Sequence, residues 1–165
     1  GGLIGVIFAM IYSSKTSKIP IIIFSDMISI VSPIGLFFGR IANFINGELF
    51  GRVTNHHFGM IFPNGGKLPR HPSQLYEAFF EGLVLLLIMI FLMNKSNFFE
   101  KRGFLTASFL FFYGIFRFFI EYFREPDGHI GLIYLNLSMG QILSLPMIVS
   151  GLYFMTVFYN KKMDN

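Results

Sequence analysis

A series of long apolar segments, separated by polar connections, limits the fold more than any other feature of the sequence. These segments run over residues 21–46, 75–93, 104–123 and 138–160. Each is close to the ~20 residues that an α-helix needs to cross a bilayer. Residues 1–12 are apolar but shorter, so we expect a span whose beginning is missing. Since backbone polar groups must pair internally in lipid, the sequence predicts an all-α, polytopic transmembrane helical bundle with about five spans, the first one truncated.

The composition agrees with a membrane protein and excludes several chemistries. Only 13% of the residues are charged, whereas soluble domains carry about 25%. The net charge is +4, but the basic residues form no stripe, so we expect a lipid bilayer and no nucleic acid as partner. The chain has no cysteine, which excludes a thiol nucleophile and a Cys-ligated metal. We expect no metal and no cofactor.

The lysines predict how the chain is oriented. They are concentrated in alternate connections, which the positive-inside rule places in the cytoplasm. We therefore expect an inward C-terminus and outward connections at 52–73 and 124–136. The expected organisation is one integral membrane domain over residues 1–165, the C-terminal part of a longer chain, with an outward loop at 52–73. The basic residues behind this orientation are Lys15, Lys18, Lys95, Lys101, Arg102, Lys161 and Lys162.

The first polar cluster ends the second apolar segment, in GRIANFINGELFGR at 39–52. On a helix Arg40, Asn43 and Gly47 share a face. An arginine near mid-membrane costs roughly 2.5–3.5 kcal/mol, so Arg40 needs a reason to be there. With Glu48 and Gly51 close behind, the pattern suits a site for an anionic head group. The alternative is a helix end whose polar residues tie it to its neighbours.

The second cluster lies in the segment 104–123 and just beyond it. Tyr113, Arg117, Glu121 and Arg124 fall within an arc of roughly 80° on a helix. A polar stripe on a membrane helix faces the bundle interior or a wet cavity. Arg117 and Glu121 can pair, but two arginines against one glutamate leave positive charge, which predicts an anionic ligand gripped bidentately. A self-neutralised structural pair is the alternative for Glu121.

Three more acidic residues have less certain roles. Glu77 and Glu81 lie four residues apart and suit either an acid–base pair or counter-ions to Arg40 and Arg117; we favour counter-ions. We expect Asp26 to pack helices rather than to catalyse. We also expect Arg40 and Arg117 to point into one shared cavity from different helices.

Four motifs resemble those of the bacterial prolipoprotein diacylglyceryl transferase family. They are G-R-x-[GA]-N-F-x-N-x-E-x-x-G at 39–51, RHPSQLYE at 70–77, RFxxExxREPD at 117–127 and SMGQILSLPMI at 138–148. The resemblance covers essentially the whole chain, in order. It implies an enzyme of the bacterial cytoplasmic (inner) membrane that moves diacylglycerol from phosphatidylglycerol to the thiol of a lipobox cysteine on a prolipoprotein. Glycerol phosphate is the other product.

The resemblance also implies roles for particular residues. Arg40, Tyr113 and Arg117 would be catalytic. The family's functional histidine precedes the Gly-Gly pair that opens this sequence and is absent from it. The general base therefore stays open between that histidine, Tyr113 and a carboxylate. Phosphatidylglycerol would be bound by Arg40, Asn43, Glu48, Gly51, Arg117, Glu121 and Arg124.

Two other classes of function use the same buried arginines. One is a membrane transporter for an anionic solute, although the chain lacks the repeated halves typical of transporters. The other is a non-catalytic membrane subunit that binds an anionic solute or lipid. A lipid-transfer assay separates all three hypotheses.

Overall fold

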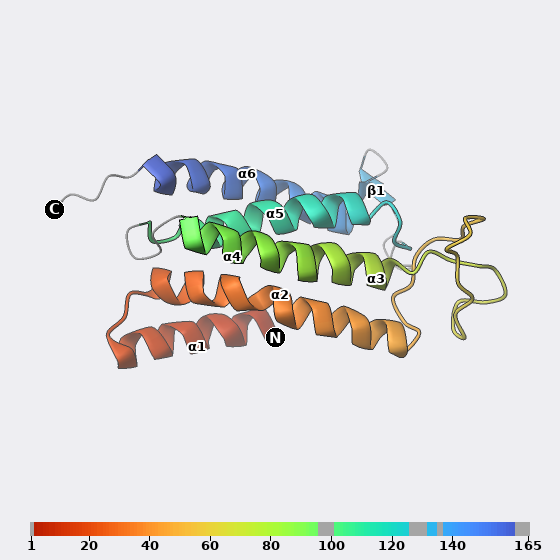
Figure 1. The fold of residues 1–165 in the computed structure, drawn as a ribbon, viewed down its shortest axis with the longest axis horizontal. Coiled ribbons are helices and arrows are strands. Elements are labelled where there is room, and N and C mark those ends of the chain that lie inside the picture. The colour runs from red at the N-terminus through yellow and green to blue at the C-terminus, as the bar shows by residue number, and fades with distance from the viewer. Residues whose placement is uncertain (1, 96–100, 126–131, 135–136, 161–165) are drawn as a thin grey trace.

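Long helices run side by side in the computed structural model, which describes residues 2–95, 101–125, 132–134 and 137–160 (Figure 1). The predicted all-α bundle is confirmed, and five helical rods correspond to the five expected spans. The third rod, Ser73–Lys95, is continuous but has a π-helical segment inside it. The helical elements are α1 (Gly2–Ser17), α2 (Ile21–Ile45), α3 (Ser73–Glu77), η1 (Ala78–Val84), α4 (Leu85–Lys95), α5 (Phe104–Ile120) and α6 (Met139–Asn160).

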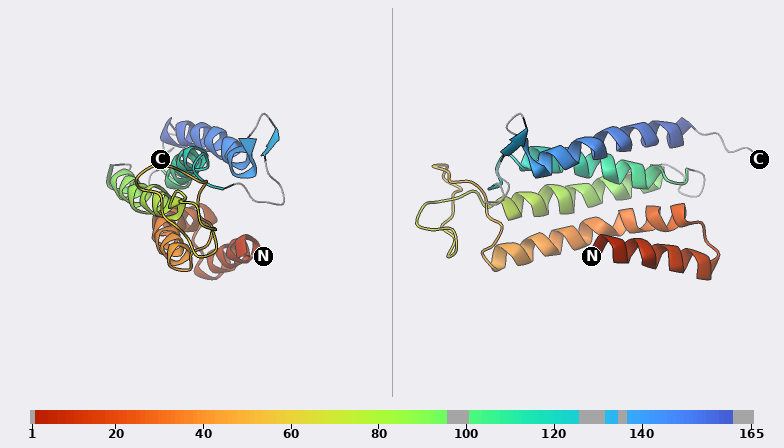
Figure 2. Two further views of the ribbon diagram at one scale, coloured as in Figure 1. Left: turned by 90° about the vertical axis from the view of Figure 1, so that its right-hand side faces the viewer. Right: turned by 180° about the vertical axis from the view of Figure 1, so that it is seen from behind.

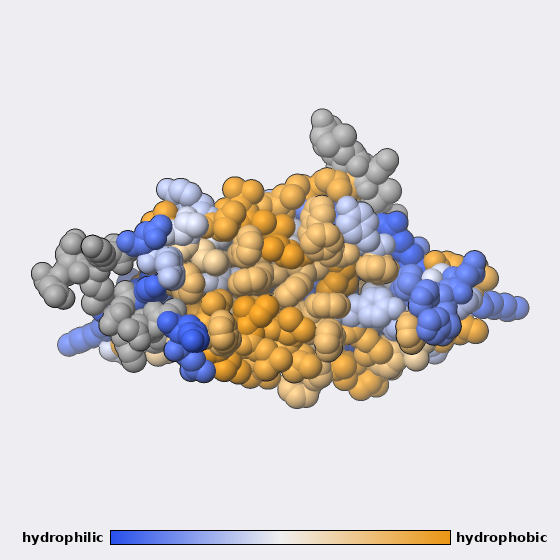
Figure 3. Space-filling model, turned by 45° about the horizontal axis from the view of Figure 1, so that its top comes forward, coloured by the Kyte–Doolittle hydropathy of each residue, from blue (hydrophilic) through white to orange (hydrophobic). Residues whose placement is uncertain are grey.

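The helices have the length and the surface of a multi-pass membrane protein. Among the described residues, α2, the Ser73–Lys95 rod and α6 are long and apolar enough to cross a membrane, and α5 is a shorter apolar helix. Large apolar side chains point outward, such as Phe38 (65% exposed) and Val149 (68% exposed). Figure 3 shows hydrophobic residues covering the middle of one face of the molecule, with hydrophilic residues toward its two ends. This is the surface that a lipid environment stabilises.

The connections lie alternately at two ends of the bundle. The α1–α2 connection and the end of α4 are at one end, and the chain between α2 and α3 is at the other (Figure 1). Figure 2 shows α1 at the edge of the bundle beside α2, with α6 on the opposite side beside α5. The lysine-rich connections thus share an end, as their sequence pattern predicts. Which end faces the cytoplasm stays a prediction, and Lys161 and Lys162 lie outside the described residues.

Several predicted boundaries shift. Helix α1 continues to Ser17, five residues beyond the apolar run, because Ser and Lys extend a helix into water without difficulty. Helix α5 ends at Ile120, three residues earlier than expected. Two short strands that were not predicted, β1 (Leu132–Tyr134) and β2 (Leu137–Ser138), pair antiparallel before α6.

The predicted packing role of Asp26 is confirmed. Its carboxylate, 1% exposed, accepts hydrogen bonds from the backbone N–H of Gly103 at 2.6 Å and of Thr106 at 2.8 Å. It also accepts one from the Thr106 hydroxyl at 2.7 Å. A side chain of α2 therefore satisfies donors that the start of α5 leaves unpaired, which holds these two helices together.

Candidate active site

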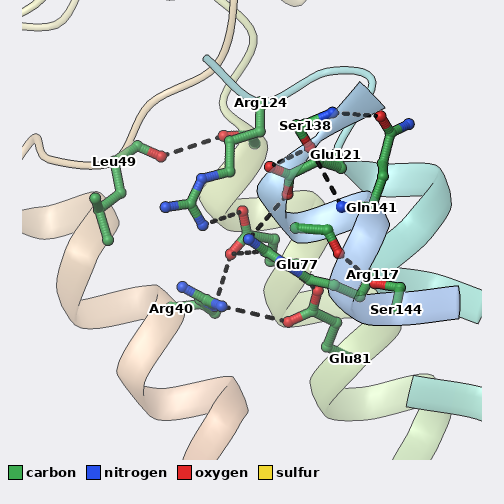
Figure 4. A network of polar contacts seen from close by, with 12 residues as sticks. Arg40, Leu49, Glu77, Glu81, Arg117, Glu121, Arg124, Ser138, Gln141 and Ser144 are labelled. Carbon is green, nitrogen blue, oxygen red and sulfur yellow. Dashed lines mark hydrogen bonds and ion pairs between the residues drawn. The ribbon is translucent and has the colours of Figure 1, made fainter. Parts of the chain in front are cut away.

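The two arginines that the sequence singles out are half-buried and meet through shared carboxylates (Figure 4). Arg40 on α2 places Nε 2.7 Å from Glu77 Oε2 and Nη2 3.5 Å from Glu81 Oε2. Arg117 on α5 places Nη1 3.5 Å from Glu77 Oε2 and 3.6 Å from Glu81 Oε1. The predicted counter-ion contacts of both glutamates are thus confirmed. The arginines come together from different helices, and the shared cavity that was also expected of them stays a prediction.

Two further residues complete the cluster. Glu121 Oε2 lies 2.9 Å from Arg117 Nη2, so the predicted pair of residues four apart is confirmed. Arg124 reaches Glu77 Oε1 at 3.7 Å. Since α5 ends at Ile120, Arg124 is not on the helix as predicted. Instead, its backbone pairs antiparallel with Gly51.

The predicted excess of positive charge is wrong. The cluster holds three arginines and three glutamates, and two of the glutamates, Glu77 and Glu81, are at most 1% exposed. The excess was counted on the stripe from Tyr113 to Arg124 alone, whereas Glu77 and Glu81, which were expected as counter-ions, reach Arg117 from the neighbouring rod. Pairing is what makes buried charges tolerable. A guanidinium carries five N–H donors, so Arg40 and Arg117 have more donors than their described contacts with carboxylates use.

The two buried glutamates lie at the start of a π-helical segment of the Ser73–Lys95 rod and inside it. Glu77 ends α3, and Glu81 lies inside η1. In the same segment Gly82 packs directly on α2, because a Cβ there would lie 2.6 Å from Cβ of Phe37. Phe37 precedes Arg40 by one helical turn, so this close approach brings the carboxylates within reach of Arg40. Short π-helical insertions are frequent at functional sites, and this one was not predicted.

A cavity of about 300 Å³ borders the charge cluster between α5 and α6. All four residues of the predicted α5 stripe line it, which confirms that they face one cavity. Arg40 is not among its lining residues, and it reaches Arg117 through the carboxylates instead. The opposite wall is mainly apolar and belongs to α6. The lining residues are Tyr113, Arg117, Glu121, Arg124, Met139, Gly140, Leu143, Ser144 and Met147.

Comparison with known proteins agrees with this arrangement. Residues 1–157 match the family model described as prolipoprotein diacylglyceryl transferase. The chain belongs to this family. A curated relative from Rickettsia akari (strain Hartford), named phosphatidylglycerol–prolipoprotein diacylglyceryl transferase, is 56% identical over 153 residues, which are 93% of this chain and 59% of the relative. A relative of the same name from Rickettsia bellii (strain OSU 85-389) is 56% identical over 153 residues, 93% of this chain and 58% of the relative. The chain therefore spans less than two thirds of these relatives.

The remaining residues of the transferase fingerprint lie beside the cluster rather than in it. The backbone carbonyl oxygen of Asn43 accepts a hydrogen bond from the backbone N–H of Glu48 at 3.0 Å. The Glu48 side chain is exposed, and its Oε1 accepts a hydrogen bond from Asn46 at 3.4 Å. The contacts that are described do not join the Asn43 and Glu48 side chains to the three arginines. Their expected part in binding phosphatidylglycerol stays a prediction.

Gly51 has an architectural task that explains its residue type. Its N–H donates to His71 O at 2.8 Å, and its backbone pairs with Arg124. A Cβ at this position would lie 2.7 Å from His71 O, so a larger residue would separate the strands. Gly51 thus places the chain segment that carries Arg124 beside the 52–73 loop.

Other contacts hold the base of the 52–73 loop against the bundle. Arg70 donates to Gly65 O at 2.8 Å and to Gly51 O at 3.2 Å, and it pairs with Glu125 at 3.0 Å. Arg52 donates from Nε to Arg124 O at 3.0 Å. The sequence argument gave neither arginine a role. Their position in a Gly- and Pro-rich loop could have indicated this role, since the backbone carbonyl groups of such a loop need side-chain hydrogen-bond donors.

Proposed function

We propose that the protein to which this chain belongs transfers the diacylglyceryl group of phosphatidylglycerol to the thiol of a lipobox cysteine in a prolipoprotein, releasing glycerol phosphate. The observation that carries the proposal is the cluster of three arginines and three glutamates at a cavity inside an apolar bundle. Membership of the transferase family and the names of the relatives support it.

The cavity has the two-sided character that an anionic lipid requires. Arg117 and Arg124 are on one wall, where a phosphate group finds charged donors. Met139, Leu143 and Met147 line the other wall at helical spacing on α6. Leu143 is 58% exposed, so this wall continues into the apolar surface of the bundle. A phosphatidylglycerol molecule can therefore keep its head group on α5 while its acyl chains stay in apolar surroundings.

In the proposed reaction the thiol gives up its proton, and the thiolate attacks the glyceryl carbon that bears the phosphate. A carbon–sulfur bond forms, and the carbon–oxygen bond breaks with its electron pair on the phosphate oxygen. Glycerol phosphate leaves with an additional negative charge. Arg117 stabilises this charge in surroundings of low dielectric constant. The thiol proton passes to a base that the described residues do not identify.

The other residues of the proposed site support Arg117. Arg40 acts through Glu77 and Glu81, which it shares with Arg117, and it takes part in phosphate binding as the shared carboxylates reorient. Tyr113 lies on the same wall as Arg117 and contacts the reacting groups. Substrate binding also involves Asn43, Glu48, Gly51, Glu121 and Arg124, as the family motif implies. We place the protein in the bacterial cytoplasmic membrane, with the C-terminus in the cytoplasm and the charge cluster toward the outer leaflet.

The test is transfer by the full-length protein. It is reconstituted in vesicles that contain phosphatidylglycerol, together with a lipobox peptide that has one cysteine. We expect the peptide to gain the mass of one diacylglyceryl group and glycerol phosphate to appear in equal amount. The matched controls are a Cys→Ser peptide and vesicles of phosphatidylcholine, neither of which should react. Lipid binding without peptide modification would instead support a binding subunit. Release of an encapsulated anionic solute without peptide modification would support a transporter.

A further inference from the structure

The start of α6 carries a hydrogen-bonded pair that the proposed reaction has not used. The N–H of Ser138 donates to Gln141 Oε1 at 3.1 Å, and the N–H of Gln141 donates to Ser138 Oγ at 3.3 Å. This reciprocal arrangement is a capping box, which satisfies donors that a helix start leaves unpaired. Both residues are buried, at 3% exposed. Helix capping alone would explain these two bonds.

The Ser138 hydroxyl does more than cap the helix. It donates to Glu121 Oε1 at 3.0 Å, while Glu121 Oε2 lies 2.9 Å from Arg117 Nη2 (Figure 4). The two oxygens of one carboxylate are thus held by different partners. A continuous series of contacts leads from the first turn of α6 through Ser138 and Glu121 to Arg117.

The backbone at Gly140 restricts the position of the Glu121 carboxylate from another side. A Cβ at position 140 would lie 2.7 Å from Oε2 and 2.8 Å from Oε1 of Glu121. The carboxylate therefore packs against bare backbone in the first turn of α6. Any side chain at Gly140 would move Glu121 away from its present place.

The contact with Glu121 is the shortest contact of Arg117 with a carboxylate, 2.9 Å from Nη2 to Oε2. The other contacts of Arg117 with carboxylates run from Nη1 at 3.5 and 3.6 Å. Neither Nη1 of Arg117 nor Oε2 of Glu121 makes a hydrogen bond of good geometry in the described part of the chain, so these contacts are ion pairs. The direction of the Arg117 guanidinium in the cavity consequently depends on where Glu121 is held.

We propose that Ser138 is a positioning residue that, with Gly140 and Gln141, fixes Glu121 and through it the guanidinium of Arg117. This inference rests on the proposed function, in which Arg117 meets the leaving phosphate. It gives the capping box a second task, because the hydroxyl that accepts a bond from Gln141 also orients the carboxylate beside Arg117.

Three substitutions in the full-length protein separate positioning from capping. Ser138→Thr keeps both the cap and a hydroxyl. Ser138→Asp keeps a good N-cap but places a carboxylate against Glu121. Ser138→Ala removes both functions. Ser150→Ala is the matched control, since Ser150 is on the same helix and its hydroxyl bonds to the helix backbone at Pro146. For each variant the melting temperature, kcat and KM for phosphatidylglycerol are measured.

We expect the Thr and control variants to keep the kcat of the unmodified protein. We expect the Asp variant to melt at a lower temperature, because it adds an unpaired buried carboxylate. We also expect it to lose roughly tenfold or more in kcat per folded molecule, the scale of a lost hydrogen bond to a charged group. Unchanged kcat in the Asp variant overturns the proposal. If the Asp variant does not fold, equal kcat in the Ala and Thr variants overturns it.

A structure of the Ser138→Asp variant tests the inference separately from the activity. We expect Glu121 to turn away from Arg117, whether or not the protein is an active transferase. An Arg117–Glu121 pair that is unchanged in this structure overturns the positioning role. Absence of transfer by the unmodified full-length protein would instead refute the proposed function.

Discussion

Arg40 Nε and Arg117 Nη1 lie 2.7 and 3.5 Å from the same oxygen atom, Oε2 of Glu77. The two arginines come from α2 and α5 and are far apart in the sequence. One carboxylate oxygen between two guanidinium groups fixes their spacing. A phosphate oxygen that enters the cluster will therefore compete with this carboxylate for the same donors, so lipid binding should rearrange the ion pairs.

We predict that Arg40→Lys loses most of the transfer activity although it keeps the charge. Arg40 uses two different nitrogen atoms for Glu77 and Glu81, and a lysine offers a single ammonium group that cannot reproduce the planar fork. We expect at least a roughly tenfold fall in the transfer rate, about 1.4 kcal/mol of activation free energy. The measurement is turnover in phosphatidylglycerol vesicles, normalised to folded protein. Near-normal turnover would show that Arg40 serves only as a positive charge.

We predict that Glu77→Gln and Glu81→Gln lower stability more than they lower the rate per folded molecule. Each substitution removes one of the buried carboxylates that Arg40 and Arg117 share, and removal of one partner from a buried ion pair typically costs about 3–5 kcal/mol. Thermal unfolding in detergent and turnover per folded molecule are compared. A stable variant without turnover would make that glutamate a catalyst.

Glu125→Gln is the matched control for this prediction. Glu125 also pairs with an arginine, at 3.0 Å, but its side chain is 46% exposed. Exposed ion pairs typically contribute less than about 1 kcal/mol. We expect the control to have nearly the melting temperature of the unmodified protein.

We predict that acidification destabilises the outer loop through His71. Burial, and then the neighbouring His56, lower the pKa of His71 below its ordinary value. The unfolded chain therefore binds a proton at His71 more readily than the folded chain does. The contribution of neutral His71 to the free energy of unfolding falls as the pH drops below the ordinary histidine pKa of about 6.5. Melting temperatures at pH 7.5 and 5.5 are compared with those of His71→Gln. The same pH dependence in both proteins would contradict this role of His71.

The fold was predictable because its main signal is local. Runs of apolar residues over 21–46 and 138–160 specify spans by length and composition alone, and the structure places α2 and α6 there. The π-helix at Ala78–Val84 and the strands β1 and β2 were missed. The π-helix depends on how Gly82 packs against another helix, and strands of two or three residues leave almost no pattern in a sequence.

The candidate site was predictable residue by residue but not as a whole. The spacing of Arg117 and Glu121 was enough to predict their ion pair. The counter-ion role of Glu77 and Glu81 was also predicted. The sharing of one Glu77 oxygen by Arg40 and Arg117 was not, because it exists only after three rods have packed. The part played by Ser138 was also missed. Only the fold places Glu121 within reach of its hydroxyl.

We predict that Asp26→Asn destabilises the bundle without lowering the transfer rate per folded molecule. Both oxygens of Asp26 accept hydrogen bonds at the start of α5, Oδ2 from Gly103 and Oδ1 from Thr106. An asparagine side chain has only one acceptor oxygen. Its NH2 group would face the backbone N–H of Gly103 or Thr106, and that buried donor would lose its hydrogen bond. The expected cost is about 1–3 kcal/mol, measured by thermal unfolding in detergent.

Thr106→Ser is the control, since it keeps the hydroxyl that donates to Asp26. The site with Arg117 is near the opposite end of α5, so turnover per folded molecule should not change. A stable Asp26→Asn variant with reduced turnover would instead connect this end of α5 to the chemistry.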